Sequence, residues 1–142
     1  MPARAPPRRT LPPGAFVRVL FPTSETPRRP GLPHIGYVLG GTEAEAMVAY
    51  TTSRPWPAGT PLPAGARVFD AEAAARLNQS RAFLLRLDVL ARLPLTEAWF
   101  PDIGRADQGV VAVAPARLQE ELTDLAMNLV RRRRALIQMR GV

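Results

Sequence analysis

The chain of 142 residues contains no cysteine, no lysine and only one histidine, His34. Without cysteine there are no disulfides, no thiolate metal sites and no thiol nucleophile. A single histidine cannot form a histidine-rich metal site, and no serine-containing triad accompanies it. We therefore expect an activity that uses no metal, no cofactor and no redox chemistry.

Long apolar runs are absent as well. No stretch approaches the roughly 20 apolar residues that cross a bilayer. The first residues, rich in proline and arginine, lack the apolar core of a signal peptide. These features predict a cytoplasmic protein that does not associate with a membrane.

The basic residues are all arginine, and the formal net charge of the chain is +7. Arginine binds phosphate through two hydrogen bonds and stacks on bases, so this composition favours a nucleic-acid partner. A GC-rich coding sequence would produce the same abundance of arginine, alanine and proline. Charge alone does not separate these two interpretations.

Composition divides the chain into a central region and two tails. Residues 1–13 hold proline, arginine and few apolar side chains, which predicts a flexible arm. Hydrophobic residues make up 46% of the chain, so residues 14–130 are sufficient for one domain with its own core. Residues 131–142 are an arginine-rich extension.

Alternating apolar segments predict a mainly β protein. Strands are expected at residues 15–21, 34–39, 46–52, 66–69, 81–90 and 109–113. In the first of them Val17, Val19 and Phe21 share one face, which indicates a half-buried strand. Gly40 and Gly41 are expected to form a turn.

The connecting segments differ in character. Residues 22–30 and 53–65 are proline-rich and predict loops, whereas the alanine-rich residues 71–77 predict one or two helical turns. Residues 93–105 look irregular, and we expect Trp99 and Phe100 to close over the core.

One amphipathic helix is expected after Pro115. Four leucines at helical spacing form an apolar stripe that would pack on the sheet: Leu118, Leu122, Leu125 and Leu129. The helical pattern continues through four arginines at residues 131–134 to residues 135–137. This cationic end is either solvated or a contact for RNA or for a protein partner.

Short strands separated by proline-rich loops and followed by one helix predict a fold class. We expect a small antiparallel barrel of SH3-like type with a C-terminal helix.

The strand at residues 81–90 carries an arginine and an aspartate two positions apart, Arg86 and Asp88. Residues at this spacing leave the same face of a sheet. A carboxylate that accepts a proton beside a guanidinium that holds a phosphate suits phosphodiester cleavage. The alternative is a surface ion pair on the polar face of the strand.

Four signatures occur in a fixed order along the chain: a first loop with Ser24-Glu25, then Arg29-Pro30, then residues 50–53 (Tyr-Thr-Thr-Ser), then residues 77–88. In these features the chain resembles the PemK/MazF toxins of bacterial type II toxin–antitoxin systems. The resemblance implies a PemK/MazF/CcdB-like barrel and a metal-independent endoribonuclease that cleaves single-stranded RNA. It also implies a homodimer and an acidic, partly disordered antitoxin.

The resemblance also implies roles for individual residues. Arg29 matches the loop arginine that stabilises the phosphate, and Arg86 with Asp88 matches an arginine and aspartate pair that supplies acid and base. Asp88 is the candidate base, and Glu25 in the first loop is the alternative. The attacking group would be the 2′-hydroxyl of the RNA, which leaves a 2′,3′-cyclic phosphate and a 5′-hydroxyl.

The motif threonine falls on Thr51 or Thr52, and the resemblance does not decide between them. His34 is left out of the catalytic set. Further candidates for RNA contact are Ser24, Arg28, Ser53, Trp56 and Ser80. A different class of function also fits the same sequence, namely a non-catalytic SH3-like module that binds RNA or a protein segment.

Overall fold

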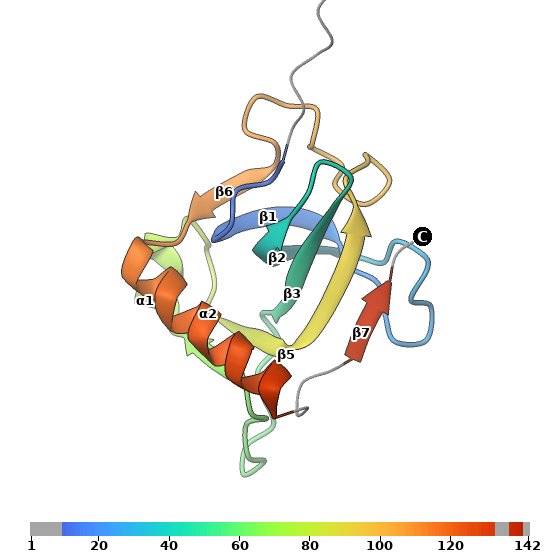
Figure 1. Ribbon diagram of the computed structural model, residues 1–142. Helices are drawn as coiled ribbons and strands as arrows, with labels where there is room; N and C mark the ends of the chain where they lie inside the picture. Colours follow the sequence, from blue (N-terminus) through green and yellow to red (C-terminus); the bar gives the residue numbers. More distant parts are fainter. Residues whose placement is uncertain (1–9, 133–136, 141–142) are drawn as a thin grey trace, which may run out of the picture.

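The computed structural model describes residues 10–132 and 137–140. It is a mainly β structure with a curled sheet and a helix after the sixth strand (Figure 1). The elements are β1 (Ala15–Leu20), β2 (Pro33–Gly41), β3 (Glu45–Thr52), β4 (Ala66–Phe69), α1 (Ala71–Arg76), β5 (Phe83–Pro94), β6 (Val110–Val113), α2 (Ala116–Arg131) and β7 (Ile137–Arg140).

The sheet has the strand order β4-β5-β3-β2-β1-β6, and all neighbours in this order are antiparallel. Strand β7 adds to the same edge of β5 beyond β4 and runs parallel to β5. The sheet curls enough for Phe16 of β1 to reach Phe69 of β4, with ring centroids 6.3 Å apart. The antiparallel strands therefore form a half-barrel.

Two apolar cores lie on the two faces of this sheet. The first core contains the aromatic rings of Phe16, Phe69 and Phe83 and is covered by both helices. The second contains Val17 and Val19 and is covered by the segment after β5. Strand β1 alternates as expected, but it is not half-buried, because each of its faces contributes to a core.

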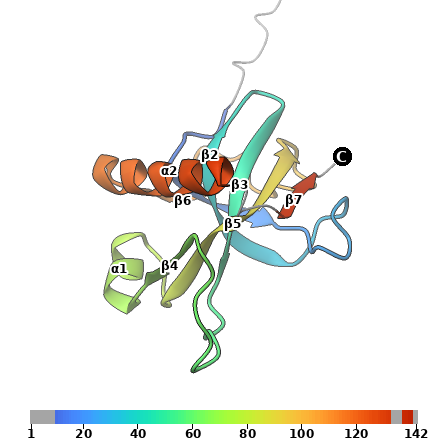
Figure 2. The ribbon, with the colours of Figure 1, turned by 60° about the horizontal axis from the view of Figure 1, so that its bottom comes forward.

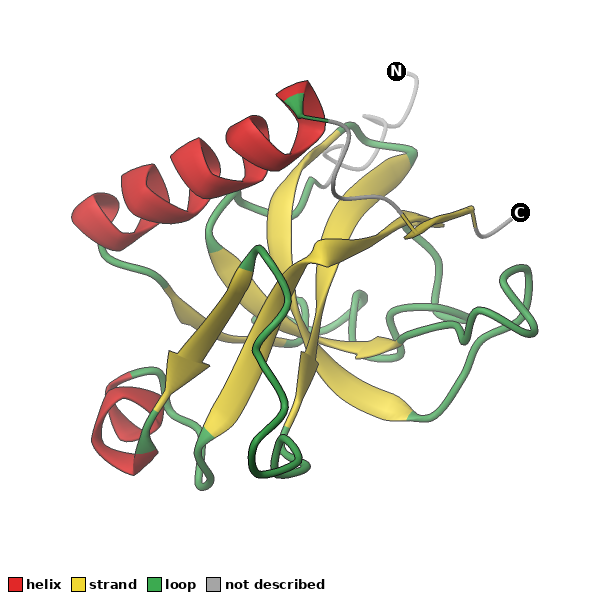
Figure 3. Cartoon of the chain, turned by 90° about the horizontal axis from the view of Figure 1, so that it is seen from below, coloured by secondary structure: helices red, strands yellow, loops and turns green. Residues whose placement is uncertain are grey.

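The helix α2 confirms the predicted apolar stripe. Leu122 and Leu129 are buried, and Leu118 and Leu125 pack beside the first core. Figure 3 shows α2 lying along the sheet, with the short α1 next to β4. The helix begins directly after Pro115, as expected. Within the part of the chain that the structure describes, no helix has the length and apolarity of a membrane span.

The expected continuation of the helix to residue 137 is wrong. The helix ends at Arg131, and Ile137 begins β7. The physical reason is a free length of sheet edge: β4 pairs with β5 only from Phe83 to Arg86, so the edge from Val89 to Arg92 is available for backbone pairing. The other predicted tail positions, residues 133–136, lie outside the described residues.

Two further expectations need correction. Gly40 and Gly41 do not form a turn, because they extend β2 through a bulge, and the chain reverses at residues 42–44 instead. In that turn the Thr42 hydroxyl accepts hydrogen bonds from the backbone N–H groups of residues 44 and 45. The strand expected at residues 81–90 begins later, at Phe83, and extends to Pro94, so the irregular segment also begins later.

The other local predictions are confirmed. Strand β4 occupies the expected residues, α1 lies within residues 71–77, and residues 53–65 form a loop that projects from the sheet (Figure 2). Trp99 and Phe100 are buried over the second core, with 3% and 0% of their surface exposed.

Candidate active site

Arg86 and Asp88 lie where the pairing of β5 with β3 is interrupted by a bulge. Tyr50 of β3 pairs with Arg86, and Ala49 pairs with Leu90, so residues 87–89 have no partner in β3. Such a bulge bends the strand and redirects side chains. The expectation that Arg86 and Asp88 lie on the same side is confirmed by the hydrogen bonds between them.

The two side chains form a bidentate ion pair. The Arg86 Nη2 atom donates to Asp88 Oδ2 at 2.6 Å, and Nε donates to Oδ1 at 3.3 Å. The side chains of Arg86 and Asp88 are 24% and 13% exposed. The pair is therefore partly shielded from water but still within reach of a ligand.

Trp56 also contacts Arg86. Its ring centroid is 5.5 Å from the Arg86 Cζ atom, which is within the range of a cation–π contact. The Trp56 indole N–H donates to the Thr60 carbonyl at 3.1 Å, so the loop itself orients the ring. Arg86 is thus held by the carboxylate of Asp88 on its own strand and by the ring of Trp56 in a loop that is distant in the sequence.

Arg86 also lines a pocket of about 290 Å³, which we call the Arg86 pocket. The loop after β1 forms one wall with Thr23, Ser24 and Leu32, and β3 contributes Tyr50. Of the residues selected from the sequence, the pocket contains Ser24 and Arg86. The other lining residues are Phe21, Pro22, His34 and Val89.

Three predicted residues of the same loop do not line this pocket. Glu25, Arg28 and Arg29 are exposed, and none of them forms an ion pair with another residue of the described ranges. They extend from a segment that builds the pocket wall, so their charges lie near the pocket without contributing to its lining.

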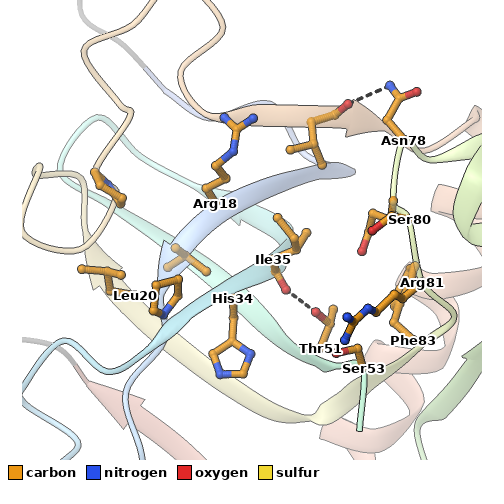
Figure 4. A pocket seen from close by; sticks show the side chains of 15 residues that line it. Arg18, Leu20, His34, Ile35, Thr51, Ser53, Asn78, Ser80, Arg81 and Phe83 are labelled. Carbon is orange, nitrogen blue, oxygen red and sulfur yellow. Dashed lines mark hydrogen bonds between the residues drawn. The ribbon is translucent and has the colours of Figure 1, made fainter.

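A second pocket, of about 550 Å³, lies at the same end of the sheet, and we call it the Arg81 pocket. It contains three of the predicted residues, Thr51, Ser53 and Ser80 (Figure 4). The remaining lining residues are Arg18, Val19, Leu20, Pro33, His34, Ile35, Asn78, Gln79, Arg81, Phe83, Pro101 and Val111.

His34 lines both pockets, although the sequence analysis set it aside. Its ring packs against Tyr50, with centroids 5.0 Å apart. Burial lowers the pKa of His34 below 6.5; a hydrogen bond to the Thr51 backbone opposes this shift, and the charge of Arg54 adds to it. The signal in the sequence was its position at the start of a strand directly after the proline-rich loop.

The two candidate threonines lie in different surroundings. Thr51 is buried, and its hydroxyl donates to the Ile35 carbonyl, so its proton is already engaged. The Thr52 hydroxyl accepts from the Arg54 backbone N–H at 3.2 Å and keeps its own proton available. In the pairing of β3 with β5, Tyr50 lies opposite Arg86 and therefore on the same sheet face. Thr52 is two residues after Tyr50, so it also lies on the face of Arg86.

In residues 10–132 and 137–140, no group of three or more histidine, cysteine, aspartate or glutamate side chains is placed to hold a metal ion. The polar groups that form the candidate site are the Arg86 and Asp88 pair and the side chains of the two pockets. No protein-family model matches the chain, and no curated protein sequence matches it either.

Proposed function

We propose that the protein is a metal-independent endoribonuclease that cleaves single-stranded RNA by attack of the 2′-hydroxyl on the adjacent phosphate. The observation that carries this proposal is the bidentate pair of Arg86 and Asp88, in which Arg86 lines a pocket and Asp88 is held against the Arg86 guanidinium. RNA supplies its own nucleophile, so the protein has to remove one proton, stabilise charge on the phosphate and protonate the leaving 5′-oxygen.

In this proposal Asp88 accepts the proton of the 2′-hydroxyl and Arg86 binds the phosphate, while the leaving 5′-oxygen takes up a proton from solvent water and departs as a 5′-hydroxyl. The geometry allows Arg86 to perform this role while it holds Asp88. Only Nε and Nη2 donate to the carboxylate, and Nη1 makes no hydrogen bond to another described residue. The guanidinium therefore has N–H groups left for a phosphate oxygen.

Arg29 and Glu25 have secondary roles in the proposal. Both are exposed on the loop that forms the wall of the Arg86 pocket. From there Arg29 reaches the phosphate when substrate is bound, and Glu25 is the alternative base. Thr52, which keeps its proton available, is the threonine that donates to a phosphate oxygen.

The biological role in this proposal is that of a toxin in a toxin–antitoxin system. It is supported by the resemblance of the sequence motifs to the PemK/MazF toxins and by the net charge of +7. A curled antiparallel sheet followed by a helix is compatible with the SH3-like barrel of that family. The partners are a second copy of the chain and an acidic, partly disordered antitoxin that covers the arginines.

The experiment compares two pairs of matched substitutions. Asp88→Asn and Arg86→Gln should each reduce the rate of RNA cleavage by about a hundredfold or more. The controls are Glu121→Gln and Arg67→Gln, which change an exposed ion pair of α2 and β4 and should leave the rate unchanged. Cleavage is followed on a long RNA labelled at its 5′ end.

One result separates cleavage from binding. If RNA binds in fluorescence anisotropy but is not cut by the unsubstituted protein, the protein is a binding module rather than a nuclease. The double variant Asp88→Asn, Glu25→Gln lacks both candidate bases. If it cleaves RNA at the full rate, the proposed mechanism is overturned.

A further inference from the structure

The Arg81 pocket and the Arg86 pocket lie at the same end of the sheet. The Arg81 pocket includes the last residue of β1, Leu20, and the first residues of β2 and β5, Pro33 and Phe83. It borders the first core through Phe83, whereas the Arg86 pocket borders the second core through Phe21. His34 lines both, so a ligand that occupies both pockets passes this residue.

The Arg81 pocket is cationic. Within the described part of the chain no acidic side chain lines it, and two arginines do. Arg18 is already paired with Asp102 at 3.3 Å, whereas Arg81 has no ion pair with a described residue. In Figure 4 Arg81 extends toward Thr51 and Ser53. Its charge is therefore available to an anionic ligand.

The pocket also has the groups that recognise a flat heterocycle. Phe83 and Val111 provide apolar surface, and side-chain amides stand beside it. The Asn78 amide already donates to the Val111 carbonyl at 2.9 Å. The Gln79 Nε2 atom is different, because it is buried and, among the described residues, has no hydrogen-bond partner. A buried donor without a partner costs free energy, and an acceptor on a ligand would satisfy it once the amide turns toward the pocket that Gln79 lines.

We infer that the Arg81 pocket binds the nucleotide next to the one whose phosphate is cleaved. Its base lies on the apolar wall and pairs with Gln79, and its phosphate is held by Arg81. The volume of about 550 Å³ lies within the range of roughly 300–1,000 Å³ that is usual for small-molecule sites. This inference rests on the proposed function, and it assigns the preference for a base at the cleavage site to Gln79.

An acidic protein segment is the competing occupant. A carboxylate would use Arg81, but it would leave the apolar wall and the Gln79 amide without a role. The combination of cation, apolar surface and unpaired amide therefore favours a nucleotide.

The test measures binding of the four nucleoside 5′-monophosphates to the full chain by isothermal titration calorimetry or amide chemical shifts. At least one of them should bind more tightly than inorganic phosphate or its nucleoside alone. Arg81→Gln should weaken it about tenfold, and Gln79→Met about fivefold, the usual scales for a charged and a neutral hydrogen bond. Arg117→Gln, an exposed arginine of α2 outside both pockets, is the matched control and should have no effect.

Gln79→Met has a second readout, because methionine has a similar volume and removes the unpaired donor. Its melting temperature should not fall, so a loss of affinity cannot be attributed to unfolding. Unchanged nucleotide affinity in both Arg81→Gln and Gln79→Met would overturn the inference. A hexaglutamate peptide that binds more tightly than every nucleotide, and only when Arg81 is present, would assign the pocket to an acidic segment and overturn it as well.

These results are independent of RNA cleavage. Nucleotide binding that depends on Arg81 and Gln79, in a protein that does not cut RNA, would preserve the pocket and overturn the proposed function. RNA cleavage with no nucleotide binding in this pocket would support the proposed function and overturn the inference about the pocket. If the protein both cleaves RNA and binds a nucleotide in this pocket, Gln79→Met should also change the distribution of bases next to the cleaved bonds.

Discussion

The ion pair of Arg86 and Asp88 should contribute far more to stability than a surface pair. Its two side chains are 24% and 13% exposed and share two hydrogen bonds. The exposed pair of Arg76 and Glu72 on α1 provides the comparison, since its side chains are 76% and 78% exposed and share one contact of 2.9 Å. A double-mutant cycle on each pair measures the coupling free energy directly.

The expected magnitudes follow from exposure and geometry. An exposed pair four residues apart on a helix couples by about 0.3–0.5 kcal/mol. Hydrogen bonds to charged groups contribute about 1.5–3 kcal/mol. Partial exposure of Arg86 keeps its coupling to Asp88 within that range rather than above it. Since about 1 kcal/mol corresponds to roughly 2–4 °C in a chain of this size, Asp88→Asn should lower the melting temperature by about 3–12 °C.

The assay is urea unfolding followed by the fluorescence of Trp56 and Trp99, with Arg86→Gln, Asp88→Asn and the double variant at low and at high salt. The coupling between Arg86 and Asp88 should largely survive in 1 M NaCl, because shielded charges are screened less than exposed ones. A coupling as small as that of Arg76 and Glu72, or one abolished by salt, would refute the argument from burial.

Three other predictions concern the core, the shared histidine and the loop. Leu122→Ala should reduce the free energy of unfolding by about 2–5 kcal/mol in urea titrations, because Leu122 is fully buried and the helix cannot fill the cavity. The pKa of His34 is lowered in the native state, so the unfolded chain binds more protons. The free energy of unfolding should therefore fall as pH falls through 6.5 toward that lowered pKa, and urea titrations of His34→Gln should not show this loss. Arg29→Ala should slow RNA cleavage by about a hundredfold, whereas Arg132→Ala, an exposed position at the end of α2, should weaken RNA binding modestly and mainly at low salt.

Local sequence patterns predicted most of the strands because their apolar side chains alternate. The prediction was incomplete in β5, where the bulge at residues 87–89 interrupts the alternation. From the last residue of the bulge onward, Val89, Leu90 and Ala91 are all buried, since both faces of the sheet are covered there. A continuous apolar run of this kind has no period from which a strand can be recognised. Strand β7 was missed for another reason, because its partner lies far away in the sequence.

In the candidate site, too, some contacts could be predicted from the sequence and others could not. The proximity of Arg86 and Asp88 could be predicted from their spacing, since it depends only on the strand that carries both. The contact of Trp56 with Arg86 depends on how a long loop folds back, and the position of His34 between two pockets depends on the ends of several strands. Gln79 could not be selected, because its missing hydrogen-bond partner is a property of tertiary packing.

The most direct test of the central claim is the chemistry of the RNA ends after incubation with the unsubstituted protein in excess EDTA. The account predicts that cleavage continues in the chelator and that mass spectrometry of the products finds 2′,3′-cyclic phosphates and 5′-hydroxyl groups. Cleavage that stops in EDTA and resumes with added metal, or products that carry 5′-phosphates, would contradict it.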